Sequence, residues 1–97
     1  MYEPIQDAAA RSRAMQFIDD LAGAADGSQE QQPGHLPLLR PALADYGWEL
    51  VNHAGHPGTL NQMRGFINGL VVAQRLSPEQ GLAFCRRLEE GEKTGWK

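Results

Sequence analysis

The strongest local signal in the chain is a helix start at Ser77. Ser77 and Gln80 form an S-x-x-Q capping box, and Pro78 occupies the first helical position. In such a box each side chain bonds a backbone N–H that the helix leaves unpaired, and proline lacks an N–H where none is needed. The pattern predicts a helix over 78–90, with Gly91 as a stop signal.

A second capping pattern precedes the first. Thr59 and Gln62 form a T-x-x-Q box, which predicts a helix over about 60–75. Its apolar residues recur at spacings of three and four, which is typical of one buried face. They are Leu60, Met63, Ile67, Leu70 and Val71, widened by Phe66 and Ala73. Only Arg75 and Leu76 separate this helix from the next, so the two form an αα-hairpin or an angled helix-turn-helix corner.

The N-terminal half predicts two more helices. The first covers about 3–25, with Pro4 in its first turn. Its apolar stripe comprises Ala10, Ala14, Phe17, Ile18, Leu21 and Ala25. The Gly- and Pro-containing segment 26–35 is predicted to be a flexible loop. A helix over about 38–53 follows; for its part 48–51 an extended segment is the alternative, although a lone strand would need a partner from a second chain.

These elements predict a single, small, all-α domain of four helices. Ninety-seven residues bury a modest core. Residues 91–97 are predicted to form a frayed tail, from which Trp96 does not easily reach the core. On the last helix Leu82, Cys85 and Leu88 are expected to face inward. The first helix is rich in alanine and has a thin apolar stripe, so we expect a homodimer to supplement the core.

Two glycines in the third predicted helix point to close packing. Gly65 and Gly69 form a G-x-x-x-G pattern, and each glycine costs up to about 1 kcal/mol relative to alanine inside a helix. Two such costs beside Phe66 indicate a close helix–helix approach. The approach is predicted within one chain, with packing across a homodimer as the alternative.

Charge excludes a general polyanion binder. The net charge is −3, and it is unevenly distributed: residues 1–49 hold 3 basic and 8 acidic residues, whereas residues 50–97 hold 6 basic and 4 acidic ones. A DNA-binding corner remains an alternative, because the last helix carries Arg86 and Arg87. A recognition helix contacts bases near its N-terminal end, however, and here that end carries Glu79. The position of these charges therefore argues against nucleic acid as a partner.

No catalytic, cofactor or metal motif is evident. His53 and His56 form an H-x-x-H pair, and His35 and Cys85 add two zinc-type ligands, but polar turn residues are the favoured interpretation of the pair. Cys85 is interpreted as a small buried hydrophobe rather than a nucleophile. Glycine-rich phosphate loops do not occur. The chain is therefore not expected to be an enzyme or to hold a cofactor or metal.

The function that remains is binding to another protein. We expect a regulator or inhibitor that occupies a surface of a larger protein, a profile that fits phage- or plasmid-borne antagonists. The candidate contact residues are Asp19, Asp20, Tyr46, Trp48, Arg86 and Arg87, with core filling as the alternative for Tyr46 and Trp48. One cysteine, no apolar run of membrane-spanning length and no secretory signal favour a cytoplasmic location.

Overall fold

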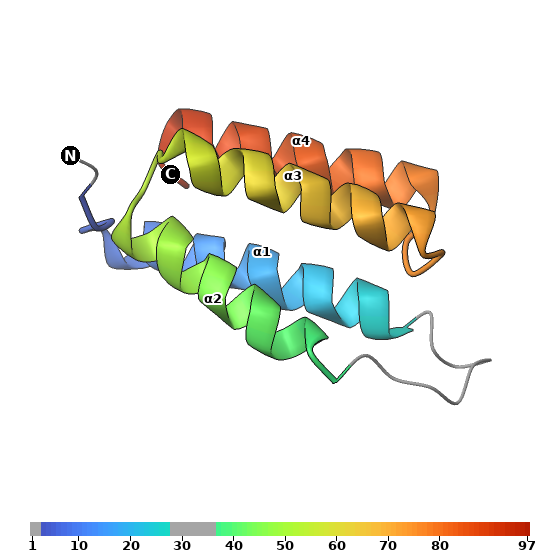
Figure 1. The fold of residues 1–97 in the computed structure, drawn as a ribbon. Helices are drawn as coiled ribbons and strands as arrows, with labels where there is room; N and C mark the ends of the chain where they lie inside the picture. The colour runs from blue at the N-terminus through green and yellow to red at the C-terminus, as the bar shows by residue number, and fades with distance from the viewer. Residues whose placement is uncertain (1–2, 28–36) are drawn as a thin grey trace.

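The computed structural model describes residues 3–27 and 37–97, and its secondary structure is entirely helical. Four helices occur in these ranges, α1 (Ala8–Gly27), α2 (Leu39–Asn52), α3 (Pro57–Val72) and α4 (Pro78–Thr94). Figure 1 shows two layers, one of α1 and α2 and one of α3 and α4, with α1 against α4 and α2 against α3. The predicted all-α class is confirmed, and segment 48–51 is helix rather than strand.

The first helix begins later than predicted. Residues 3–7 are not helical, because Asp7 caps α1: its carboxylate accepts a hydrogen bond from the N–H of Ala10 at 3.0 Å. The preceding segment lies along the end of α2, where the N–H of Ile5 donates to the carbonyl of Val51 at 2.8 Å. A proline near a helix start is compatible with the first turn, but here Pro4 precedes it. The predicted loop 26–35 begins inside α1, and its part 28–35 lies outside the described residues.

The predicted apolar stripe of α1 is confirmed, since all six of its members are buried. Helix α2 starts and ends within one residue of the predicted 38–53, with Pro41 in its first turn. Gly47 is buried in α2, and a Cβ built there would lie 3.4 Å from side-chain atoms of Met15 and Ile18. The glycine therefore allows α1 and α2 to approach closely.

Both predicted ends of the third helix are wrong. Helix α3 starts at Pro57, and His56 caps it through Nδ1, which accepts from the N–H of Gly58 at 3.0 Å. Thr59 is consequently buried inside the helix rather than capping it. The helix ends at Val72 because Gln74 adopts a left-handed conformation with φ of 64°. Such a residue closes a Schellman turn and is usually glycine, so no local signal indicated a helix end at this position.

Helix α4 confirms the predicted capping box and extends beyond the predicted end. Ser77 Oγ accepts from the N–H of Gln80 at 3.0 Å, and Gln80 Oε1 accepts from the N–H of Ser77 at 2.8 Å. Gly91 is inside the helix, which stops instead at Gly95 with φ of 66°. Leu88 is buried and Cys85 is partly buried, but Leu82 is 54% exposed, contrary to prediction.

The predicted frayed tail folds back onto the core. Trp96 is 6% exposed, and the centroid of its ring lies 5.4 Å from that of the Phe17 ring. Its indole N–H donates to Glu92 at 3.2 Å, and its carbonyl accepts from Arg13 at 3.0 Å. Gly91 makes room for the ring, since a Cβ there would approach it to 2.5 Å. The tail thus completes the contact between α1 and α4.

Candidate protein-binding surfaces

The most exposed aromatic side chain among the described residues is Trp48, at 56%. It borders a groove of about 390 Å³ between α1 and α2. The remaining lining comprises Arg11, Ser12, Met15, Ala44, Gly47, Val51 and Asn52. Met15 is 40% exposed and flexible, so it can adapt to a bound group. This Trp48 groove thus combines an apolar floor with a few polar side chains.

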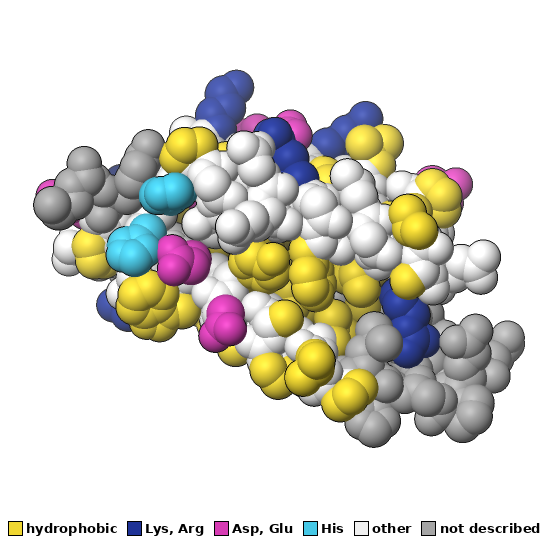
Figure 2. Space-filling view, viewed as in Figure 1, with side chains coloured by type: hydrophobic (Ala, Val, Ile, Leu, Met, Phe, Trp, Pro, Cys, Tyr) yellow, Lys and Arg dark blue, Asp and Glu magenta, His cyan; other side chains and the backbone are white. Residues whose placement is uncertain are grey.

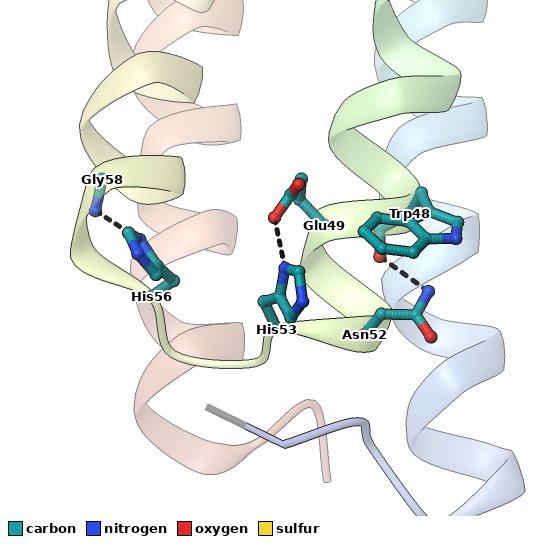
Figure 3. A network of polar contacts seen from close by, with 6 residues as sticks. All are labelled: Trp48, Glu49, Asn52, His53, His56 and Gly58. Carbon is teal, nitrogen blue, oxygen red and sulfur yellow. Dashed lines mark hydrogen bonds and ion pairs between the residues drawn. The ribbon is translucent and has the colours of Figure 1, made fainter. Parts of the chain in front are cut away.

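A polar network holds the end of α2 beside Trp48 (Figure 3). The side chain of Asn52 donates to the carbonyl oxygen of Trp48 at 2.9 Å. His53 lies edge-on to the indole, with ring centroids 5.2 Å apart, and its Nδ1 is 2.7 Å from a carboxylate oxygen of Glu49. The His53 contact restricts the rotamers of the Trp48 side chain, and the hydrogen bond fixes the side chain of Asn52, which lowers the entropy cost of binding at the groove.

The two histidines of the H-x-x-H pair have separate roles. His53 contacts Glu49 on α2, whereas His56 caps α3 (Figure 3). Within residues 3–27 and 37–97 no three His, Cys, Asp or Glu side chains form a group suited to a metal ion. His35, the third histidine considered, lies outside the described residues.

Tyr46 is not a free anchor. It is half-buried, and its ring lies edge-on to Phe66 with centroids 5.4 Å apart. The pair joins α2 to α3, so core filling is the correct interpretation of Tyr46. Phe66, expected to support a close helix approach, packs within the chain against Tyr46. Of the two candidate aromatic anchors, Trp48 is the more exposed.

Gly65 and Gly69 do not mediate a close approach within the described part of the chain. Both are exposed, and a Cβ at either would meet no atom within 4 Å. The predicted packing within one chain is therefore wrong. The close approaches occur at other glycines, most tightly at Gly81, where a Cβ would lie 2.4 Å from Val71. The G-x-x-x-G spacing pointed to Gly65 and Gly69, because the spacing of glycines does not show which atoms lie next to them in the fold.

The charged candidates on α1 and α4 differ in availability. Asp20 pairs with Arg87 at 3.0 Å, and the Arg87 guanidinium lies 5.4 Å from the ring centroid of Phe17. The hydrogen bond from Gln16 is the main cause that lowers the pKa of Asp20; burial opposes it, and Arg87 lowers the pKa further through a hydrogen bond and its charge. Asp19 and Arg86 are exposed. Arg87 and Asp20 therefore hold the two layers together.

Cys85 is partly buried on α4. Burial is the main cause that raises the pKa of its thiol, Glu89 raises it further, and Arg64 opposes them. A thiol with a raised pKa is largely protonated at neutral pH, and the protonated form is a poor nucleophile. The environment of Cys85 thus favours its interpretation as a small packing residue.

A second hollow, which the sequence did not predict, lies between α2 and α3. Its volume is about 350 Å³, and all of its lining residues are apolar. They are Pro37, Leu38, Leu39, Ala42, Phe66 and Leu70. Figure 2 shows the apolar side chains between the two helices on this face of the molecule. The hollow lies where the two layers meet, and these layers contact each other less extensively than the helices within each layer.

No helix in the described part of the chain is long and apolar enough to cross a membrane. Comparisons of the chain with models of known protein families, with curated proteins and with solved structures found no match.

Proposed function

We propose that this chain is a non-enzymatic, protein-binding regulator that inhibits or remodels a larger protein by occupying one of its surfaces. The observation that carries the proposal is the exposed Trp48 beside the groove between α1 and α2. Tryptophan and arginine dominate binding hot spots, which gather where apolar surface is covered on association. A side chain that is 56% exposed and packs edge-on against His53 is a suitable anchor.

The polar rim of the Trp48 groove indicates the chemistry of the partner. Arg11 lines the groove and makes no ion pair with another described residue. It lies in the first turn of α1, whose N-terminus carries a partial positive charge. A suitable partner segment would insert an apolar side chain into the groove and place a carboxylate beside Arg11 and the positive N-terminus of α1.

Capture from a host lysate, with and without Trp48, tests the proposal. Proteins retained by the wild-type chain are identified by mass spectrometry and then compared with those retained by Trp48→Ala. The matched control is Leu38→Ala, which removes a side chain that is 76% exposed at another surface. We expect a partner that Leu38→Ala retains and Trp48→Ala loses, with binding weakened about tenfold or more. Equal capture by all three chains would overturn the proposal.

A DNA-binding regulator is the weaker alternative. The arrangement of α3 alongside α4 in Figure 1 favours an αα-hairpin over the steeply angled corner of a DNA-binding motif. Arg87 is engaged by Asp20 and Phe17, and Arg86 lines a hollow with Glu89 and Glu90. A duplex-binding titration at low and moderate salt tests this alternative. Affinity that falls steeply with salt would favour it over the protein-binding proposal.

We also propose that the regulator acts as a homodimer. The support is the apolar surface left exposed in a chain with a small core, at Val72 and Leu82. Such residues stabilise a small domain when a second copy covers them. Sedimentation equilibrium at tens of micromolar measures the state directly, and a monomer there would overturn the homodimer while leaving the Trp48 proposal standing.

A further inference from the structure

The exposed face of α3 carries no charge. Its exposed residues after the first turn are Asn61, Gln62, Gly65, Asn68, Gly69 and Val72. The one charged residue of α3, Arg64, pairs with Glu89 of α4 at 3.1 Å. Figure 2 shows uncharged polar and apolar side chains across the middle of this face, with most charged side chains nearer its edges.

We propose that a second copy of the chain packs antiparallel across this face, with Val72 of each copy against Gly65 of the other. The seam rests on the homodimer proposed above and gives it a location and a register. Val72 is 84% exposed, the largest value among the exposed large hydrophobic residues described. Gly65 has no neighbouring atom within 4 Å of its Cβ position, so it leaves space for an incoming side chain.

Helical geometry makes these two features reciprocal. Gly65 and Val72 are seven residues apart, which places them two turns apart on the same side of α3. In an antiparallel pair related by a two-fold axis near Asn68 and Gly69, residue 65 of one helix faces residue 72 of the other, and the reverse contact follows by symmetry. Each copy thus provides one projecting side chain and one space to receive it.

Charge favours a second copy over an unrelated partner. In a two-fold interface like residues meet at and near the axis, so a charge on that face would repel its own copy. The uncharged Asn68 and Gly69 avoid this repulsion. A partner recognised by opposite charge would instead find on α3 only Arg64, whose guanidinium already pairs with Glu89.

The neighbouring helix widens the contact. A specific interface buries about 1,000 Å² or more in total, so α3 alone is a narrow platform. Gly81 of α4 meets Val71 of α3, and the residues that follow them, Leu82 and Val72, are both exposed. Leu82, at 54% exposure, therefore extends the apolar end of the seam onto α4.

Sedimentation equilibrium of variants tests the seam. Val72→Asp is expected to raise the dimer dissociation constant about tenfold or more, because it buries a carboxylate that has no partner. Ala83→Asp, which adds the same charge to an exposed position of α4, is the control and should leave the constant unchanged. Thermal unfolding followed by circular dichroism checks that both variants remain folded. A wild-type dimer that Val72→Asp does not weaken would overturn the seam alone, and a wild-type monomer would overturn the homodimer with it.

Disulfide trapping tests the register. In a Cys85→Ser background, chains with Gly65→Cys are mixed with chains with Val72→Cys and exposed to a mild oxidant. The antiparallel register predicts a covalent dimer in the mixture and little with either variant alone, because residue 72 faces residue 65 rather than its own copy. Equal cross-linking by Val72→Cys alone would overturn this register. Neither outcome bears on capture through Trp48.

Discussion

Helices α3 and α4 both contain two glycines in their interiors, but they use them in opposite ways. In α4, Gly81 and Gly91 are buried, and a Cβ at either would overlap a neighbouring side chain. In α3, Gly65 and Gly69 are exposed with no atom near their Cβ positions. The α4 glycines are therefore explained by packing within the chain, whereas the α3 glycines have no such explanation.

The exposed faces of α3 and α4 also differ in charge. The exposed residues of α4 include six charged ones, Glu79, Arg86, Arg87, Glu89, Glu90 and Lys93. The exposed face of α3 has none. A charged face resists burial more strongly than an uncharged one, because an unpaired buried charge costs more than a polar group that finds a hydrogen bond in the interface. This difference is the reason why we centre the proposed contact between two copies on α3 rather than on α4.

The largest expected effect on stability comes from removing the Trp96 ring, which packs against Gly91 of α4. Trp96→Ala is expected to lower the free energy of unfolding by about 3 kcal/mol or more, because a buried aromatic ring leaves a cavity. Trp48→Ala removes an exposed ring and should cost far less. Urea unfolding of the two variants measures the difference. Similar losses for both would contradict the burial of the C-terminal tail.

The glycines give the direct test of the comparison. Gly91→Ala is expected to lower the free energy of unfolding by about 1 to 3 kcal/mol, because its methyl group would overlap the Trp96 ring. Gly65→Ala should instead raise it, by up to about 1 kcal/mol, since alanine favours helix and nothing lies nearby. Thermal unfolding followed by circular dichroism, at a concentration where both are monomeric, checks the opposite signs. A change of the same sign in the free energy of unfolding of both variants would contradict the distinction between the glycines of α3 and those of α4.

A smaller effect is expected at the contact of α4 with α1. Arg87→Ala removes the ion pair with Asp20 and the cation–π contact with Phe17, for a loss of about 1 kcal/mol. Arg86→Ala is the matched control, because Arg86 is exposed on the same helix. Urea unfolding at low and high salt separates the two variants. A loss at Arg86 as large as that at Arg87 would contradict the assigned contact.

The smallest effect is a dependence on pH. Burial is the main cause that raises the pKa of Glu92, while Trp96 and the backbone of Gly55 lower it in part. The folded state therefore binds this proton more tightly than the unfolded chain. Its contribution to stability is present in acid and is lost as the pH rises from the ordinary pKa of glutamate through the raised one.

Glu92→Gln is the corresponding test, because it keeps an oxygen acceptor for the Trp96 N–H. At neutral pH it should raise the free energy of unfolding by less than about 1 kcal/mol, since the side chain is partly exposed. The gain should disappear below the ordinary pKa of glutamate. Urea unfolding across this pH range measures it. Glu90→Gln, on the exposed side of α4, provides the control.

The sequence predicted much of the fold from local patterns. The apolar stripe of α1, the approximate extent of α2 and the capping box at Ser77 depend on residues close together in the chain, and all three agree with the structure. At the candidate site it identified Trp48 as a possible anchor. It could not separate Trp48 from Tyr46, because both lie in α2 and only the position of Phe66 on α3 shows which one is covered.

What only the tertiary structure decided concerns residues distant in sequence or unusual in backbone. Gln74 ends α3 in a conformation that normally calls for glycine, so no local signal marked it. Trp96 reaches the core because Arg13, 83 residues away, binds its carbonyl and Gly91 leaves room for its ring. Local sequence determined where helices form, through propensity and caps. The packing of one helix on another determined which glycines lie against a neighbouring side chain, which tryptophan is buried and which face of α3 is exposed. Each of these depends on atoms from a different part of the chain.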